Sequence, residues 1–426
     1  MTEFFPQELV DAIIDEVQDF DDLKACSLTC RNFSSRSHSL LFQKLNLNGK
    51  FHLDAFQRFH DPCIESSHIP PLVRTLCIHE YHRGSALRDR PKSDIVNSLL
   101  RLMQNLEVIK FYNGTSFVDF CDGSLARFSS HSFREIHLYD IFFLKNGLDQ
   151  MYAMLQGSPK LERLVVHHTG PCVLPMFGGD ETSQSRLEHT HVTRRGPLIQ
   201  NLSVMSRPSY RCPAFIEAIL ETKTCPVSIN ELHQFAFSLS DIIDFQHLDK
   251  MLALTSDTLR VPSLTFNCPN ALHSHPLDRL PIIRMGHLRK ITFVITHGLY
   301  GFYYLQWWIQ SLKRVIASDG RPALRIMDIE LGHSFSLVHP ALHPEWNKFD
   351  TILASLPFDD AFQTLTIKVH KRLWDEEENQ WDQGRLPWSL ENFSCEPWQS
   401  LEARAEDLKA QFPRLAAKGK LLVKVI

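Results

Sequence analysis

The sequence lacks a strong excess of either charge. Its 45 Lys and Arg residues are balanced by 49 Asp and Glu residues, which gives a formal net charge of −4. Without a global basic field, the chain has no electrostatic reason to collect on nucleic acid or on anionic lipid. Its start also lacks a cationic segment followed by an apolar run, so we expect no secretory signal and a soluble chain in the cytoplasm or nucleus.

The signatures of catalysis and cofactor binding are missing as well. No G-x-G-x-x-G or G-x-x-x-x-G-K-[ST] phosphate loop occurs, and no G-x-S-x-G elbow or H-E-x-x-H pair. The ten cysteines are scattered without a Cys-x-x-Cys pair. His189-x-His191 and His273-x-His275 have no third ligand at a recognisable spacing, which favours loop histidines over a metal site. We therefore expect a protein that is not an enzyme, with no catalytic residues, no cofactor and no metal.

One stretch is apolar enough to suggest a membrane span. Residues 291–312 contain no Asp, Glu, Lys or Arg, and a spanning helix needs about 20 apolar residues. The stretch is interrupted by Gly298 and Gly301, however. It divides into a β-branched run, a glycine-punctuated turn and the start of an amphipathic helix. We expect it to belong to a folded domain rather than to a membrane.

The first 41 residues have the periodicity of short helices. Pro6 suits the first turn of a helix, and Glu8 favours its positive end. Apolar side chains then recur with helical spacing on one side, with acidic ones opposite: Leu9, Val10, Ile13, Ile14 and Val17. Asp21 or Asp22 could cap a second helix, and a third would run from about 34 to 41. Because so short a bundle buries little surface, we expect part of the apolar stripe to pack against a partner protein or against the rest of the chain.

The motif in this segment resembles an F-box of the kind common in fungal proteins. It comprises Phe5-Pro6, Glu8, Leu9, Ile13, Val17, Asp22-Leu23, Cys30-Arg31, Phe33 and Leu41-Phe42. The resemblance implies docking on a Skp-type adaptor and, through it, membership of a cullin-based SCF ubiquitin ligase. The adaptor-binding residues it implies are Phe5, Pro6, Glu8, Leu9, Ile13, Val17, Leu23, Cys30 and Phe33.

The rest of the chain repeats an apolar triplet at positions i, i+3 and i+5, as in the strands of leucine-rich repeats. Its central residues are separated by 27 (Ile109 to Ile136) to 38 (Leu164 to Leu202) positions. The central residues are Leu45, Leu76, Ile109, Ile136, Leu164, Leu202, Phe235, Leu264, Ile291, Met327 and Leu365. Helical patterns recur between them, for example over 95–103 and 308–316. The sequence therefore predicts an α/β chain in which strand and helix alternate.

Two architectures fit that alternation, a doubly wound sheet and a leucine-rich-repeat horseshoe. A nucleotide-binding doubly wound sheet should have glycine clusters after its strands, and none occurs. We therefore expect an irregular, degenerate leucine-rich-repeat-like solenoid over residues 48–426, after a small helical F-box domain over 1–47. Polar segments near 170–198 and 374–398 interrupt the rhythm and are expected to be long loop insertions.

These features predict a substrate-recognition subunit that binds an adaptor through the F-box and a protein substrate through the repeats. Because side chains alternate along a strand, the residues within and just after each triplet should share the concave face. The substrate-binding candidates are His79, Lys110, Tyr112, His137, Tyr139 and His167. A competing site is the aromatic segment 300–308. The alternative function is a leucine-rich-repeat interaction scaffold that joins no ligase, and an enzyme on a doubly wound sheet comes third.

Overall fold

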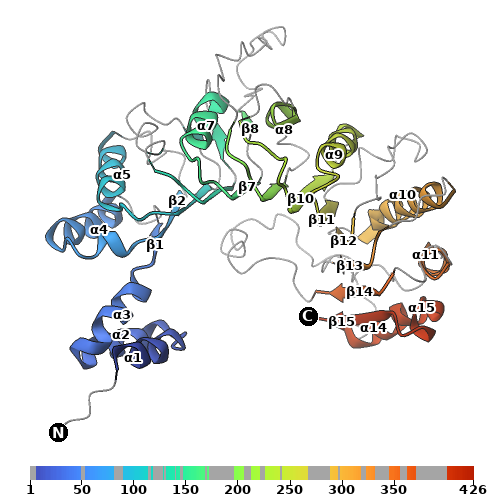
Figure 1. Cartoon of the computed structure of the whole chain (residues 1–426), viewed down its shortest axis with the longest axis horizontal. Coiled ribbons are helices and arrows are strands. Elements are labelled where there is room, and N and C mark those ends of the chain that lie inside the picture. The colour runs from blue at the N-terminus through green and yellow to red at the C-terminus, as the bar shows by residue number, and fades with distance from the viewer. Residues whose placement is uncertain are drawn as a thin grey trace, which may run out of the picture. The chain divides into compact units, whose positions relative to one another are not determined.

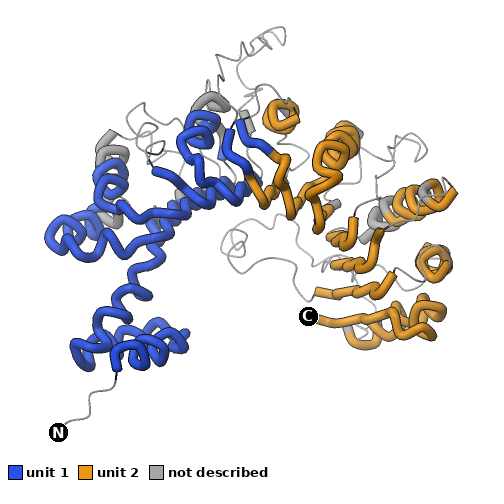
Figure 2. The backbone as a smooth tube through the Cα atoms, viewed as in Figure 1, with its two compact units in different colours: residues 1–198, 223–228 blue, residues 199–222, 229–426 orange. Residues whose placement is uncertain are grey.

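The structure is a computed structural model of the 426-residue chain. It describes residues 6–48, 53–80, 90–113, 117–118, 128, 131–139, 141–143, 147–167, 170–171, 196–205, 213–220, 226–239, 242–266, 288–295, 298–317, 323–331, 345–355, 362–370 and 401–426. The chain divides into two compact units (Figure 2). Unit 1 comprises residues 1–198 and 223–228, and unit 2 comprises 199–222 and 229–426.

Strands and helices alternate through both units (Figure 1). Unit 1 contains α1 (Gln7–Asp15), α2 (Phe20–Thr29), α3 (Arg31–Leu41), β1 (Lys44–Asn48), α4 (Leu53–Glu65), the 3-10 turn η2 (Pro70–Leu72), β2 (Thr75–Glu80), α5 (Arg90–Leu102), β3 (Val108–Asn113), β4 (Phe117–Val118), β5 (Glu135–Tyr139), β6 (Phe142–Phe143), α7 (Gly147–Gln156), β7 (Arg163–His167) and β8 (Gly170–Pro171). Unit 2 contains β9 (Asn201–Met205), α8 (Pro213–Leu220), β10 (Gln234–Leu239), α9 (Ile242–Leu254), β11 (Val261–Phe266), β12 (Lys290–Ile295), α10 (Gly298–Ala317), β13 (Ile326–Leu331), α11 (Glu345–Leu353), β14 (Thr364–Val369), α14 (Leu401–Ala410), α15 (Pro413–Ala417) and β15 (Leu421–Val425).

The first three helices enclose a small core. Ile14, Leu23 and Leu41 are buried together, and Val17 and Phe33 pack against them. The predicted capping of the second helix is wrong. The cap is the earlier Asp19, whose carboxylate accepts hydrogen bonds from the amides of residues 21 and 22 at 2.8 and 3.0 Å. An N-cap side chain reaches the amides two and three positions ahead, so Asp21 and Asp22 lie inside the first turn instead.

The main sheet has twelve parallel strands, so the α/β class is confirmed. In unit 1 the strand order is β1-β2-β3-β5-β7, and in unit 2 it is β9-β10-β11-β12-β13-β14-β15. Within each unit the order of strands in the sheet therefore follows the order in the chain. A doubly wound sheet reverses its strand order at a switch point, and neither unit contains such a reversal.

The predicted core residues are buried in these strands. Ten of the triplet centres are 0 to 2% exposed: Leu76, Ile109, Ile136, Leu164, Leu202, Phe235, Leu264, Ile291, Met327 and Leu365. In unit 1 the register joins Leu76 to Ile109, Ile136 and Leu164 across successive strands. Side chains in register on parallel strands stack in a file, so each repeat covers its neighbour.

One triplet was placed two residues out of register. Phe235 pairs with Pro262, whereas Leu264 pairs with Phe237 on one side and Phe293 on the other. The repeat centre in β11 is thus Pro262, and the predicted position of Leu264 in the central file is wrong. Proline was not counted among the apolar residues of the triplet, so the pattern slipped to the next match. A slip of two residues preserves the inward side of a strand, which is why Leu264 is buried all the same.

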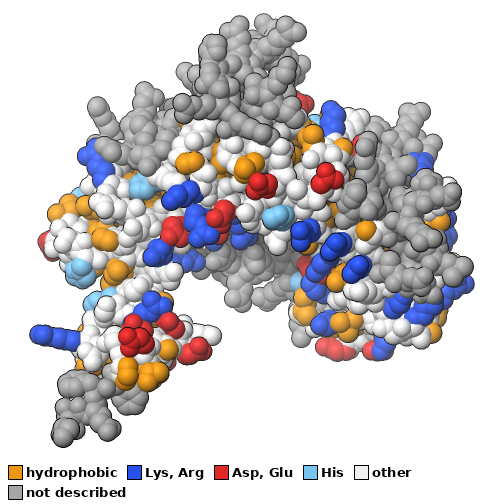
Figure 3. Space-filling view, viewed as in Figure 1, with side chains coloured by type: hydrophobic (Ala, Val, Ile, Leu, Met, Phe, Trp, Pro, Cys, Tyr) orange, Lys and Arg blue, Asp and Glu red, His pale blue; other side chains and the backbone are white. Residues whose placement is uncertain are grey.

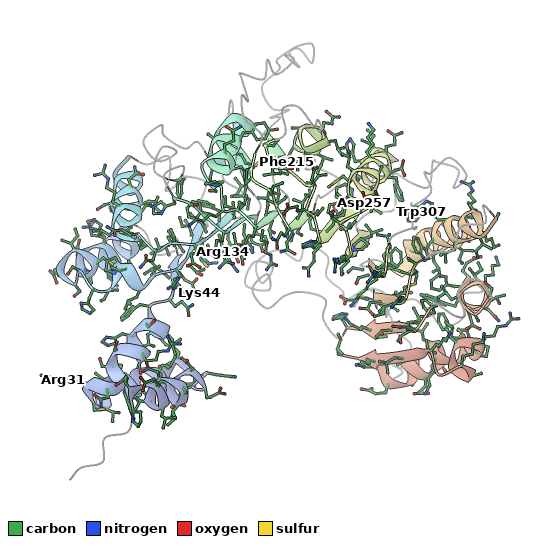
Figure 4. The ribbon with its side chains drawn as sticks, in the orientation of Figure 1. Arg31, Lys44, Arg134, Phe215, Asp257 and Trp307 are labelled. Atoms are coloured by element: carbon green, nitrogen blue, oxygen red, sulfur yellow. The ribbon has the colours of Figure 1, made fainter. Side chains whose placement is uncertain are left out.

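Helices cover the strands of each unit. Figure 1 shows α9, α10, α11 and α14 following one face of the unit 2 strands. The expected glycine-punctuated turn at Gly298 and Gly301 is wrong, because α10 begins at Gly298 itself. Trp307, labelled in Figure 4, and Trp308 on this helix are each 2% exposed. Their ring centroids lie 4.7 Å from that of Phe245 and 4.6 Å from that of Phe293, respectively. This part of the competing aromatic segment therefore belongs to the core.

Unit 1 also contains a small sheet that the sequence pattern did not predict. Its strands β4, β6 and β8 have two residues each and pair in parallel. Two residues are too few to display an alternating pattern. Gly170 and Pro171 of the expected loop 170–198 lie in this sheet, residues 172–195 lie outside the described residues, and so does the whole of 374–398. No helix in the described ranges is long and apolar enough to cross a membrane.

The C-terminal helices are fastened to α11 by a buried carboxylate. Asp350 is fully buried, and its oxygens accept hydrogen bonds from the amides of Arg414 and Leu415 at 3.0 and 2.9 Å. These amides open α15, whose first-turn N–H groups have no partner within the helix. Asp350 therefore supplies the acceptor for the buried amide of Leu415 and for the partly buried amide of Arg414.

Replacing Asp350 by alanine should loosen the C-terminal end of unit 2. The buried amide of Leu415 and the partly buried amide of Arg414 would lose their acceptor, and a buried unsatisfied group costs about 1–3 kcal/mol. We expect amide hydrogen exchange in β15 to accelerate while exchange in β10 stays unchanged. The exposed Asn347→Ala on the same helix is the control. Unchanged β15 protection in Asp350→Ala would contradict this role.

Candidate functional site

The three N-terminal helices leave some apolar side chains outside their core. On α1, Leu9 and Ile13 are 51% and 58% exposed, and they lie four residues apart, which places them on one side of the helix. We call this pair the α1 apolar face. Phe20 and Leu28 on α2 are exposed as well. The helices are held to one another by other contacts, including the ion pair between Arg36 and Asp15.

The predicted adaptor-binding residues separate into two groups. Pro6, Glu8, Leu9, Ile13 and Cys30 are exposed, whereas Val17, Leu23 and Phe33 pack in the helical core. Phe5 lies outside the described residues. The buried group can hold the helices in place, and the exposed group can contact another protein. The apolar stripe predicted on the first helix divides in the same way, because Leu9 and Ile13 are exposed whereas Val17 packs against the core. A stripe wider than the small core extends past its edge.

A row of rings runs across four strands of unit 1. His79, Tyr112, Tyr139 and His167 pair in register on β2, β3, β5 and β7. The ring centroids of His79 and Tyr112 are 4.4 Å apart, those of Tyr112 and Tyr139 4.6 Å, and both pairs are stacked within a few degrees of parallel. Tyr139 and His167 meet edge to face at 5.0 Å. The predicted neighbours are thus brought together, and we call them the ring row.

Members of the ring row differ in how much surface they offer. Tyr112 is only 6% exposed, whereas His79, Tyr139 and His167 are half-buried. Stacked neighbours cover both faces of the Tyr112 ring. Tyr112 therefore supports the row, and the other three are the members with surface left to contact a partner. The sequence predicts that the four residues share a file, but it does not predict their difference in exposure, which depends on the rings on either side.

A second row lies two residues earlier in the same strands. It contains Lys110 and His137, which pair in register. His137 is buried, its Nε2 lies 2.9 Å from a carboxylate oxygen of Glu135, and its Nδ1 lies 3.2 Å from the Tyr139 hydroxyl. A carboxylate only accepts, so Nε2–H donates to Glu135 and Nδ1 accepts from Tyr139. His137 thus positions Tyr139, and it is too buried to contact a partner itself.

Burial controls the charge of His137. It lowers the pKa of the imidazole to about 4, and Lys110 and Arg163 act in the same direction, while the hydrogen bond to Glu135 opposes them. The nearby carboxylate alone would favour the imidazolium. However, the ring is only 3% exposed, so a charge on it would have little hydration, and the neutral form is favoured. The 2.9 Å contact with Glu135 therefore joins a neutral imidazole to a carboxylate.

Acidic pH should destabilise unit 1 through His137. Because the folded-state pKa is lowered, the unfolded chain takes up a proton as pH falls below about 6.5, while the folded chain resists until about 4. The contribution of neutral His137 to stability is fully present above about pH 6.5 and is lost as the pH falls to about 4. The total loss is on the order of 3 kcal/mol. Between these pH values, the free energy of unfolding measured in urea should fall more steeply with decreasing pH for wild type than for His137→Gln. Equal slopes would contradict the buried neutral state.

The strand starts of unit 1 form a ladder of alternating charge. Arg74, Glu107, Arg134 and Glu162 occupy one position in four successive repeats, joined by backbone hydrogen bonds of 2.7 to 2.9 Å. Arg74 pairs with Glu107, and Arg134 lies 3.9 Å from Glu107 and 2.8 Å from Glu162. We call these four residues the paired ladder. Figure 4 labels Arg134 within it, and Figure 3 shows red and blue side chains side by side over these strands.

The described residues show no group of three or more His, Cys, Asp or Glu side chains that could hold a metal ion. The histidine pairs at 189–191 and 273–275 lie outside those residues. Tests of the sequence against known proteins add no family: no protein-family model matches the chain, and no curated protein matches it either. The surfaces described above are therefore the basis for assigning a function.

Proposed function

We propose that the chain is the substrate-recognition subunit of an SCF-type ubiquitin ligase. The helices α1–α3 would bind a Skp-type adaptor, and through it a cullin. The repeats, which we propose form an irregular leucine-rich-repeat-like horseshoe, would bind a protein substrate. In this proposal the chain supplies binding and placement, and the chemistry of ubiquitin transfer belongs to other subunits.

The observation that carries the adaptor proposal is the α1 apolar face. Leu9 and Ile13 stay exposed beside a helical core that is already closed by Ile14, Leu23 and Leu41. Burying a leucine or isoleucine side chain contributes roughly 1.5–3 kcal/mol. Two such side chains on one helix turn give an apolar partner a reason to bind there. The order of the F-box residues in the sequence indicates which partner that is.

The observation that supports a substrate site is the ring row. Tyrosine adds apolar area and a polar tip while losing little rotamer entropy, and it is enriched at binding hot spots. The stack fixes each ring before any partner arrives. Because pre-ordered side chains lower the entropic cost of binding, a rigid ring row suits recognition of a protein segment.

Affinity capture tests the function as a whole. Full-length tagged chain, expressed in its native cell type, should co-purify with a Skp-type adaptor and a cullin in amounts comparable to its own, as measured by mass spectrometry. The scaffold alternative shares the ring row but has no use for the α1 apolar face. Recovery of binding partners with neither ligase component among them would favour the scaffold and contradict the ligase proposal.

A further inference from the structure

The strand starts of unit 2 contain one kind of charge only. Arg260, Arg289 and Arg325 occupy the position in β11, β12 and β13 that the paired ladder occupies in unit 1. The same hydrogen-bond pattern marks that position: the carbonyl of Arg289 accepts from the amides of Arg325 and Ile326 at 2.8 and 3.1 Å. In unit 1 the carbonyl of Arg74 accepts from the amides of 107 and 108 at 2.9 and 3.0 Å. We call these three residues the arginine row.

Within the described residues, no acidic side chain lies within ion-pair distance of the arginine row. The two acids of β13 are paired with lysines: Asp328 lies 2.8 Å from Lys290, and Glu330 lies 2.7 Å from Lys368. All three arginines are exposed. Figure 3 shows Lys and Arg side chains gathered over β12–β14. At the same register position, unit 1 neutralises its charges and unit 2 leaves three like charges on adjacent strands.

We propose that the arginine row binds an acidic segment of a partner protein through carboxylate or phosphate groups. Neighbouring strands lie about 4.8 Å apart, so the row spans roughly 10 Å. Alternate side chains of an extended peptide are separated by about 6.7 Å, which flexible arginines can match. The guanidinium fork donates two parallel hydrogen bonds to a carboxylate or phosphate. The row thus fits a short segment with two or three acidic side chains.

A nucleic acid fits this surface less well. Protein–DNA interfaces typically engage about six to ten phosphates, whereas the row offers three cations on a chain whose net charge is −4. The proposal deepens the proposed function, because it rests on the chain being a protein-binding subunit and gives the chemistry of one segment it binds. It involves neither α1–α3 nor an adaptor.

Fluorescence anisotropy with purified full-length chain tests the proposal. The probes are a labelled ten-residue peptide with glutamate at alternate positions, the same peptide with phosphoserine there, and one with glutamine. We expect the acidic peptides to bind, the glutamine peptide to bind at least about tenfold more weakly, and added salt to weaken the acidic ones. Because phosphoserine carries more negative charge than glutamate, the phosphoserine peptide is compared with a longer glutamate peptide of equal net charge. Tighter binding of the phosphoserine peptide at equal charge would identify phosphate as the preferred group, and equal binding would show that carboxylates suffice.

The decisive variant replaces Arg260, Arg289 and Arg325 by glutamine. It should weaken acidic-peptide binding by at least about tenfold. The matched control, Arg74→Gln with Arg134→Gln, removes arginines from the same register where they are paired, and it should leave binding within about twofold. In thermal melts the control should lose stability, whereas the triple variant should not, because it relieves like-charge repulsion.

Four results would overturn the proposal. The first is that neither acidic peptide binds wild type, and the second is that the triple variant and the control weaken peptide binding equally. The third is that the triple variant loses as much stability as the control. The fourth is that a single-stranded oligonucleotide of equal charge binds more tightly than the acidic peptides. Since no adaptor is present in the assay, each of these results leaves the adaptor proposal standing. Failure of adaptor capture, conversely, would leave the peptide measurement valid.

Discussion

Replacing Leu9 and Ile13 together by aspartate is expected to abolish capture of a Skp-type adaptor without unfolding α1–α3. Both side chains are more than half exposed in the isolated chain, so the free protein tolerates the change. In a complex, each carboxylate would face an apolar surface without a partner, which costs several kcal/mol. Quantitative immunoblotting of adaptor recovered on tagged chain should show a loss of roughly a hundredfold or more.

A matched control separates this effect from a general effect of surface charge. Ile64 on α4 is 57% exposed, close to the 58% of Ile13, and it also belongs to unit 1. Ile64→Asp should capture as much adaptor as wild type. Circular dichroism should show equal helix content in all three proteins. If the Leu9 and Ile13 variant, so shown to be folded, still recovers adaptor at the wild-type level, the adaptor contacts this chain elsewhere or not at all.

Truncating Tyr139 and His167 to alanine is expected to abolish substrate capture while adaptor binding persists. These two members of the ring row are partly exposed, and they contact each other edge to face. Loss of both removes two of the three half-buried rings of the row and leaves only His79. Hot-spot truncations typically cost about 2 kcal/mol or more each, so the pair should lower affinity by at least roughly a hundredfold. Substrates identified by proximity labelling supply the capture assay.

Tyr112 is not suited to this test, because at 6% exposure its truncation would leave a cavity in the stack. The comparison variant is Asp328→Asn with Glu330→Gln, in β13 of unit 2. It alters two strand residues on another part of the sheet and should affect capture less. Normal capture by the Tyr139 and His167 variant, together with loss in the Asp328 and Glu330 variant, would place the substrate site toward the C-terminal repeats.

Much of the strand register could be predicted because burial leaves a periodic trace in the sequence. Ile109, Ile136 and Leu164 each sit at the centre of an apolar triplet, and one interior file requires apolar side chains there in every repeat. Pro262 shows the limit of that pattern. It fills the same file with a residue type that the pattern did not include. The two-residue strands β4, β6 and β8 leave no periodic trace at all.

The candidate site was predictable in position but not in exposure. Counting one residue past each triplet places Tyr112 and Tyr139 in one file, and the register agrees. Which ring remains accessible depends on neighbours about 30 residues away in the chain, and so does the burial of His137. The arginine row escaped prediction for a related reason. Its distinguishing feature is that no acidic side chain of the described residues lies within ion-pair distance of it, which no local pattern records.

The proposed binding of α1–α3 to a Skp-type adaptor can be tested with the two purified proteins alone. Full-length chain and purified adaptor, mixed at equal concentrations, are separated by size exclusion, and the mass of the eluting species is measured by light scattering. We expect a single complex whose mass is the sum of one copy of each protein, and no such complex with the Leu9 and Ile13 aspartate variant. Separate elution of the folded wild-type chain and the adaptor would contradict it.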